Sequence, residues 1–472
     1  MKELTEIEIL QETVIKGDYC IGCGACAAKA GSPFGVKMDE FGKYVAYIDE
    51  RKPVDKDVKV LQTCPFSGVS KNEEELGNML FPNNIKDTHI GNYLKTFAGH
   101  VVENDFREKG SSGGFGKWVG HILLKEKEID YLIQVTPNFT KRSDVPLYDY
   151  QVFTDADEVI KGSKSSYYPT NLEKVIARVE STNGRYAITG VPCFIKAIRL
   201  ISLENQLIAD RVKFTLGIVC GGMKSANQSK MIGWQLGVHP DHLIGIDFRR
   251  KHKDKSARRK IYQVWSNNDD IERYETDSSL LGSDFGAGYF KPNACDYCDD
   301  VVSETADISF GDAWLPQYVQ DPKGTSLVIV RNEKILAIME RYLEKGQIML
   351  DEIQRDEAVK SQDGGFRHRR EGLSFRLGKK EKARQWYPKK RVLPNQFPLS
   401  RQRKKIYTLR EGLKQQSHLL FYEAMQKNRF EIFVKGMEPL MRKYKKANAM
   451  SLFTRGVNKL KRISASIFGS KK

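Results

Sequence analysis

The sequence has no apolar run that approaches the ~18 residues of a membrane-spanning helix. It also lacks a Walker sequence and the GxGxxG fingerprint, which excludes a P-loop and the standard dinucleotide-binding motif. Its first residues, MKELTEIEIL, are acidic and alternating, unlike the start of a signal peptide. We therefore expect a cytoplasmic protein.

Cysteine is scarce, with eight residues in 472, yet these cysteines are grouped in the sequence. In a large cytoplasmic chain, grouped cysteines bind metal or do redox chemistry more often than they form disulfides. The cysteines are therefore the first candidates for a functional site.

Charge is unevenly distributed. Residues 361–472 carry a net charge of +23, whereas residues 1–360 carry −6, which together give +17. A near-neutral body with a strongly basic tail predicts two functional units. The basic runs Lys389–Arg391, Arg401–Lys405 and Arg442–Lys446 could meet phosphates. The amphipathic segment 451–468 could lie on an anionic bilayer, which would make the protein peripheral at the inner face of the membrane.

The alternation of strand and helix patterns predicts an α/β domain with a mainly parallel sheet. We expect a ferredoxin-like segment at residues 1–75, the α/β domain at 76–370 and a basic, mostly helical extension at 371–472. The clearest predicted strands are 96–104, 131–137, 185–189 and 213–220, and the clearest predicted helices are 115–123 and 408–426.

The first cysteine group has the spacing of an iron–sulfur site. Cys20, Cys23 and Cys26 form a CxxCxxC run, and Cys64 precedes a proline further along. Such a run surrounds a [4Fe-4S] cluster, with its fourth ligand supplied by a remote cysteine. Ala30 stands where a local fourth cysteine would, so the group predicts a single cluster completed by Cys64. Zinc is the main alternative, although zinc sites usually combine two CxxC pairs.

The second group consists of Cys193, Cys220, Cys295 and Cys298. Cys193 follows a predicted strand and Cys220 ends one, so both lie at the edge where α/β sheets bind ligands. The last two form a CxxC pair. The four could converge on a second metal, but a cysteine after a strand is often a small buried residue, and a CxxC pair is also typical of redox sites.

Three further loops could hold a cofactor. Gly110–Gly116 lies between a strand and a helix, where glycines and free amides suit a phosphate, although a flexible, well-capped turn explains it equally. Lys161–Tyr168 combines hydroxyls, cations and aromatic rings, or is a solvated loop. Asp312 follows a predicted strand, where it could orient a cofactor or cap a turn.

Together these segments resemble the family formed by the beta subunits of coenzyme F420 (deazaflavin) hydrogenases and dehydrogenases. The matching pieces run in order from about residue 17 to residue 370: CIGCGACA, TCPFSG, SSGGF, KGSKSSYYP, ITGVPCFIKAIR, GIVCGGMKS, CDYCDD and ADISFGDAW. The resemblance implies an FAD-binding α/β domain fused to a ferredoxin-like segment. It also implies a second [4Fe-4S] cluster on Cys193, Cys220, Cys295 and Cys298. The residues it places on the flavin are Ser111, Ser112, Gly113, Gly114, Lys164, Ser165 and Tyr167.

The resemblance implies an iron–sulfur flavoprotein oxidoreductase. Electrons would pass from ferredoxin or a similar donor through the clusters to FAD and then to an organic acceptor. The alternative is an electron-transfer subunit whose partner holds the substrate site, and association with other copies of the chain is also open. A zinc-bearing membrane-binding or nucleic-acid-binding protein is less favoured, and nucleic acid least, because no recognised binding fold is evident.

Overall fold

The computed structural model describes the backbone of residues 4–162 and 164–468 and the side chains up to residue 449. The N-terminal segment contains short helices and one antiparallel hairpin, with β1 paired to β2. Its elements are α1 (Glu6–Ile9), η1 (Leu10–Ile15), α2 (Ala25–Ala28), β1 (Phe34–Met38), β2 (Tyr44–Ile48) and α3 (Glu73–Leu80).

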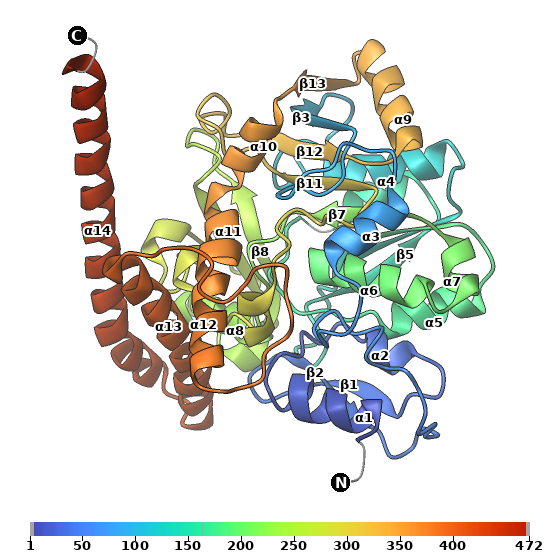
Figure 1. The fold of residues 1–472 in the computed structure, drawn as a ribbon, viewed down its shortest axis with the longest axis horizontal. Coiled ribbons are helices and arrows are strands. Elements are labelled where there is room, and N and C mark those ends of the chain that lie inside the picture. Colours follow the sequence, from blue (N-terminus) through green and yellow to red (C-terminus); the bar gives the residue numbers. More distant parts are fainter. Residues whose placement is uncertain (1–3, 163, 469–472) are drawn as a thin grey trace.

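A large twisted sheet forms the body of the molecule (Figure 1). Its strands and connecting helices up to residue 218 are β3 (Lys95–Val101), α4 (Phe115–Lys125), β4 (Tyr131–Pro137), β5 (Tyr148–Phe153), η2 (Asp157–Lys161), α5 (Glu173–Ser181), β6 (Tyr186–Gly190), α6 (Pro192–Ser202), α7 (Gln206–Arg211) and β7 (Val212–Ile218). The remaining elements of the large sheet and its covering helices are β11 (Ile308–Asp312), β12 (Ser326–Val330), α9 (Glu333–Glu344), β13 (Ile348–Glu352), α10 (Arg355–Ser361) and α11 (Asp363–Arg367).

The prediction of a mainly parallel sheet is wrong. Among the described strands, the sheet has the order β13-β3-β12-β11-β7-β6-β4-β5, and only the pairs β11–β7, β7–β6 and β6–β4 are parallel. The links from β4 to β5 and from β11 to β12 contain no helix, so these strands return as antiparallel neighbours. Each of the individual strands and helices named above is confirmed, with ends that shift by a few residues.

Five strands nevertheless run in the same direction. The pairings give β3, β4, β6, β7 and β11 one direction, and β5, β12 and β13 the opposite one. The carboxyl ends of the five therefore meet at one edge of the sheet, which is where open α/β sheets bind ligands.

Side chains alternate between the two faces of the sheet, and both faces are covered. On β12, Val328 and Val330 pack with α4 and α9, whereas Leu327 and Ile329 pack with residues of α10 and α11 on the other face. This period of two follows from the pleat of a strand. The sheet is thus buried on both sides, and its carboxyl edge remains available for a site.

A second, antiparallel sheet has the order β10-β9-β8. It packs with α8 and with the helical hairpin of α13 and α14 around Ile232, Phe290, Phe421 and Phe433. The elements of this region are α8 (Ala226–Gln235), η3 (Pro240–His242), β8 (Leu243–Lys251), β9 (Lys260–Ser266), β10 (Arg273–Thr276), η4 (Asp277–Ser279), η5 (Phe285–Ala287), η6 (Asn293–Tyr297), η7 (His368–Gly372), α12 (Leu373–Lys382), α13 (Arg401–Gln426) and α14 (Phe430–Phe468).

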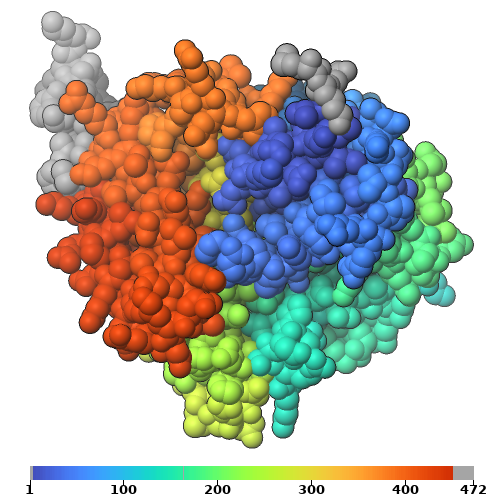
Figure 2. All heavy atoms as spheres, turned by 90° about the horizontal axis from the view of Figure 1, so that it is seen from below, coloured from blue at the N-terminus to red at the C-terminus, as the bar shows by residue number. Residues whose placement is uncertain are grey.

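The basic extension packs closely against the body. One hydrophobic core joins Val14, Phe194 and Leu377, which belong to the three predicted domains. Figure 2 shows the N-terminal segment (blue) beside residues of the extension (orange). The division at residues 75 and 370 stays a prediction, but the three segments share their core.

The basic runs of the extension differ in exposure. The side chains of Lys390 and Arg391 are only 5% and 17% exposed, so the prediction that the whole Lys389–Arg391 run meets external phosphates is wrong for these two cations. Most of the runs at Arg401–Lys405 and Arg442–Lys446 are exposed. Contact with an anionic membrane stays a prediction, and the side chains of its segment 451–468 lie outside the described residues. Within the described part of the chain, no helix has the length and apolarity to cross a bilayer.

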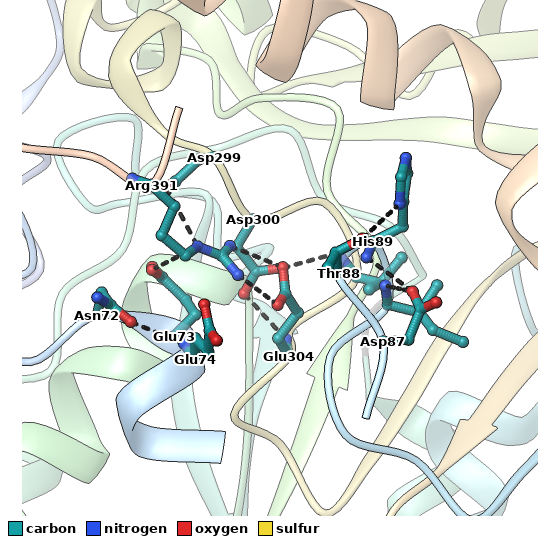
Figure 3. A network of polar contacts seen from close by, with 12 residues as sticks. Asn72, Glu73, Glu74, Asp87, Thr88, His89, Asp299, Asp300, Glu304 and Arg391 are labelled. Atoms are coloured by element: carbon teal, nitrogen blue, oxygen red, sulfur yellow. Dashed lines mark hydrogen bonds and ion pairs between the residues drawn. The ribbon is translucent and has the colours of Figure 1, made fainter. Parts of the chain in front are cut away.

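Arg391 lies in a buried network of carboxylates (Figure 3). Its guanidinium forms a bidentate pair with Glu304, with N–O distances of 2.7 and 2.8 Å, and its Nε lies 3.4 Å from Asp299 and 3.7 Å from Glu73. Lys196 Nζ adds a second cation 3.1 Å from Glu73. Burial alone would raise the pKa of Asp299, but Lys390 and Arg391 hold it below its usual value. The network ties the extension to the body through compensated charges.

We predict that Arg391→Met lowers the free energy of unfolding by about 3–5 kcal/mol, because it leaves buried carboxylates without their cation. Urea unfolding followed by circular dichroism measures this. Lys389→Met is the matched control, since Lys389 is exposed and its loss should cost less than about 0.5 kcal/mol. Equal stability of the two variants would contradict the structural role of the network.

Candidate functional site

A cavity of about 460 Å³ opens at the carboxyl edge of the large sheet. Its walls include residues at or beyond the carboxyl ends of β4, β6, β7 and β11, and the loop that follows β3. This volume is typical of a pocket for a cofactor or small molecule. The direction shared by the five strands explains why chain segments far apart in the sequence meet there.

The predicted cofactor residues gather at this cavity. Seven of the eight line it: Ser111, Ser112, Gly114, Lys164, Ser165, Tyr167 and Asp312. The eighth, Gly113, lies behind the wall, where its backbone N–H donates to Ser326 Oγ at 3.0 Å. The two predicted loops touch directly, because the N–H of Ser165 donates to Ser111 Oγ at 2.6 Å.

The glycine loop ends at the open N-terminus of α4. Gly114 precedes this helix with φ of +95°, and a Cβ there would lie 2.8 Å from backbone atoms of Phe106 and Arg107. Only glycine fits that conformation and spacing. No side chain caps the helix, so its first amides are available to an anion at the cavity.

Arg249 of β8 is a site residue that the sequence interpretation missed. It lines the cavity and pairs with Asp312 through two N–O contacts of 2.8 and 2.7 Å. Its second Nη atom also donates to the carbonyl oxygen of Ser111 at 3.2 Å. Burial would raise the pKa of Asp312, but Arg249 holds it below its usual value. Asp312 is therefore an anion at neutral pH, and it orients Arg249 against the glycine loop.

Lysines without carboxylate partners add positive charge. Lys117 Nζ donates to the carbonyl oxygens of Lys109 and Ile160, both at 3.0 Å, and the side chain lines the cavity. Burial, together with Lys164 and Lys109, lowers the pKa of Lys117 to about 7. Lys251 donates to the carbonyl oxygens of Arg107 and Ser112, and burial lowers its pKa to about 8. No local sequence signal separates these buried lysines from ordinary surface ones.

In the first cysteine group, Cys20 and Cys23 lie in the loop between η1 and α2, and Cys26 lies in α2. Gly22 and Gly24 have φ of +69° and +84°, which lets the chain turn between the cysteines. Cys20 Sγ accepts N–H groups from Gly22 and Ala46, each at 3.4 Å. Burial raises the pKa of Cys26 well above its usual value, and the proximity of Cys20, Cys23 and Cys64 raises it further. The four predicted ligands are therefore electrostatic neighbours.

The second cysteine group lies between the first group and the cavity. Burial raises the pKa of Cys193, and Cys298, Cys295 and Cys220 add to this effect, as does Cys23 of the first group. Met223 donates its N–H to Cys295 Sγ at 3.3 Å. Gly222 donates in the same way to Cys220, which itself lines the cavity. The structure thus brings together four cysteines whose convergence the sequence alone did not decide.

Zinc and a [4Fe-4S] cluster place different requirements on the cysteine sulfurs of the two groups. In the described part of the chain, no three His, Cys, Asp or Glu side chains are grouped tightly enough for a single metal ion. Zinc binds all four thiolates at about 2.3 Å from one point. In a [4Fe-4S] cluster each thiolate binds a different iron, so the sulfurs stand further apart. The backbone N–H groups on Cys20, Cys220 and Cys295 are of the kind that stabilises cluster sulfurs.

Comparison with known proteins places most of the body in one family. The chain matches two family models described as coenzyme F420 hydrogenase/dehydrogenase, beta subunit. The model of the N-terminal part matches residues 96–177, and the model of the C-terminal part matches residues 183–356. Together the two matches span more than half of the 472 residues.

Individual relatives are distant in sequence. An uncharacterized protein of Methanocaldococcus jannaschii is 25% identical over 384 residues, which cover 76% of this chain and 96% of the relative. One of the F(420)H(2) dehydrogenase subunits of Methanosarcina mazei is 23% identical over 331 residues, or 70% of this chain and 83% of the relative. A chain from a structure of the F420-reducing [NiFe] hydrogenase complex from Methanosarcina barkeri aligns with a TM-score of 0.46 and 17% identity, covering 62% of this chain and 96% of that one.

We predict opposite effects for two glycines of the loop. A Cβ on Gly113 would lie 2.3 Å from the carbonyl oxygen of Gly99 and 2.8 Å from the backbone N of Ser326, so Gly113→Ala should lower stability by roughly 1–3 kcal/mol. A Cβ on Gly116 would meet only Phe310, at 4.0 Å, so Gly116→Ala in α4 should raise stability by about 0.5–1 kcal/mol. Chemical denaturation tests both, and a neutral Gly113→Ala would contradict the packing of the loop.

Proposed function

The chain belongs to the family of coenzyme F420 hydrogenase/dehydrogenase beta subunits, as its motifs indicated, and from this premise we propose that it is an iron–sulfur flavoprotein oxidoreductase. The two cysteine groups would each hold a [4Fe-4S] cluster, and the cavity at the carboxyl edge would hold FAD. One observation carries the proposal. Cys23 of the first group neighbours Cys193 of the second, and Cys220 of the second lines the cavity, so the three sites are contiguous.

The cysteine groups fit clusters in their chemistry. Each group offers four cysteines and backbone N–H donors to sulfur, in surroundings where burial disfavours free thiolates. Burial raises the pKa of Cys64 and Cys298 to about 12, so bare thiols would stay protonated at neutral pH. Iron would replace those protons and stabilise the thiolate form.

The cavity fits a flavin nucleotide. The glycine loop and the N-terminus of α4 would receive phosphate, with Lys117 beside them. Tyr167 offers an aromatic wall and lies against Phe248 and Phe285, with ring centroids 5.4 and 5.2 Å away. A flavin, when bound, would exchange single electrons with the clusters and two electrons with an organic acceptor.

The electron donor and the need for a partner are further parts of the proposal. A ferredoxin or similar protein would deliver electrons at the first group, and the chain would reduce an organic acceptor at the cavity. The alternative, that the chain is one component of a larger complex, is favoured by its similarity to a component of an F(420)H(2) dehydrogenase. Turnover of the purified chain alone, with a reduced donor and candidate acceptors, would defeat this alternative.

We predict about eight irons, eight sulfides and one FAD per chain after anaerobic purification, since each [4Fe-4S] cluster contributes four irons. Cys26→Ala and Cys193→Ala should each retain about four irons, because each removes a ligand from a different cluster. Iron and sulfide analysis, flavin fluorescence and electron paramagnetic resonance measure these quantities. Zinc with no flavin in the native chain would contradict the proposal.

We predict that Lys117→Met weakens FAD binding on the order of tenfold, because it removes a charged donor near the phosphates. In the native chain, FAD affinity should rise as pH falls from about 8 to 6, since Lys117 gains its proton around its lowered pKa of about 7. In the Lys117→Met variant, FAD affinity should still change with pH near 8, because Lys251 remains and has a pKa of about 8.

Two comparisons make this test specific. Lys125→Met, on the same helix but exposed, should leave FAD affinity unchanged. Riboflavin, which lacks phosphate, should bind the native chain and Lys117→Met equally. A Lys117→Met chain that loses affinity for both ligands in equal measure would show that the lysine does not act on phosphate.

A further inference from the structure

Arg369 belongs to the turn η7, beyond residue 356, where the match to the family ends. The residue is only 2% exposed. It therefore brings a guanidinium, which stays charged under all ordinary conditions, into the interior of the protein.

In the described part of the chain, this cation forms no ion pair. One Nη atom donates to the carbonyl oxygen of Cys220 at 2.8 Å, while Nε and the other Nη have no hydrogen-bond acceptor. The carboxylate that acts on it is the buried Asp300, whose oxygens accept backbone N–H groups instead. A buried and unpaired charge is costly, so its surroundings should contain a compensating anion.

The second cysteine group, once it holds a cluster, is the anion that would compensate the charge of Arg369. Cys298, Cys220 and Cys295 are the charges that act most strongly on its guanidinium, ahead of Asp300. Three of the four cysteines therefore act on the guanidinium. Four thiolates around a cluster carry net negative charge, which would satisfy the orphaned donors.

The cations that act on the first cysteine group are Lys43 and Lys390. Lys43 lies near Cys20, but its ammonium is paired with Asp18 at 3.0 Å, and Asp18 itself acts on Cys20. Lys390 acts on both Cys64 and Cys298, and it is paired with Asp299.

Near the second group, Lys291 acts on Cys295 but is paired with Asp296, and burial lowers the pKa of the nearby Lys224 to about 7. Arg369 is the permanently charged cation beside this group that forms no ion pair in the described part of the chain, so the charge asymmetry between the two groups rests on it.

Nearby carboxylates do not cancel this asymmetry. Asp299 and Asp300 follow Cys298 directly, but Asp299 is paired with Arg391 and Lys390, at 3.4 and 3.8 Å. Asp300 accepts the backbone N–H groups of Val302 and Glu304, both at 2.9 Å. Asp300 also acts on Arg369, but less strongly than Cys298, Cys220 and Cys295 do.

We propose that Arg369 is a positioning residue that serves as the counter-cation of the second cluster and raises its reduction potential above that of the first. The inference rests on the proposed function, because it presumes the two clusters. Reduction adds one electron to a cluster, and a buried cation beside it stabilises the added negative charge. An electron that enters at the first group would thus be drawn toward the cavity.

The test is an anaerobic potentiometric titration followed by electron paramagnetic resonance. Arg369→Met should make reduction of the second cluster about tenfold less favourable, which is about 59 mV for one electron. The first cluster should be unaffected. Arg369→Lys keeps the charge. Its equilibrium constant for reduction of the second cluster should therefore stay within about threefold of the native value, a smaller change than the tenfold change expected for Arg369→Met. The Cys26→Ala chain, which retains the second cluster, assigns the signals.

Arg367→Met is the matched control. Arg367 lies two residues away, is 36% exposed and pairs with Asp363, so its loss should leave both potentials unchanged. An Arg369→Met chain with full iron and a native second potential would overturn the proposal, as would Arg369→Lys behaving like Arg369→Met. Loss of the second cluster from both Arg369 variants would assign the residue to assembly, and would also overturn it. Absence of iron from the native chain would instead refute the proposed function.

Discussion

The shared direction of five strands is the constraint on which the rest of the site depends. Because β3, β4, β6, β7 and β11 run the same way, their carboxyl ends meet at one edge. That edge receives the glycine loop from β3, Cys193 from the end of β6 and Cys220 from the end of β7. The strands β5, β12 and β13 run the opposite way, so their carboxyl ends lie at the other edge.

Buried charge is the second feature that organises the molecule. Arg249 with Asp312 orders the cavity wall, and Arg391 with its carboxylates ties the extension to the body (Figure 3). In both networks a bidentate arginine meets a carboxylate, and neither partner tolerates loss of the other. Arg369 differs, because it forms no ion pair in the described part of the chain and two of its nitrogens have no hydrogen-bond acceptor there.

The part of the chain outside the family match contributes to the core of the molecule. The matched region ends at residue 356, yet Arg369, Lys390 and Arg391 lie beside the cysteine groups or the acidic network beneath them. The basic composition of the extension therefore has two physical sources. Some of its cations neutralise buried acids, and those on the exposed faces of α13 and α14 remain free to meet an external anion.

The sequence alone determined the local features. The CxxCxxC spacing, the glycine loop before α4 and most strand and helix positions follow from periodicity and turn chemistry over a few residues. Only the tertiary structure decided what depends on distant contacts. The pairing of β4 with β5 and of β11 with β12 made the sheet mixed, and folding gathered Cys193, Cys220, Cys295 and Cys298. It also buried Lys390 and Arg391, because a cation's exposure depends on which acids the fold places around it, and residues remote in sequence supply those acids.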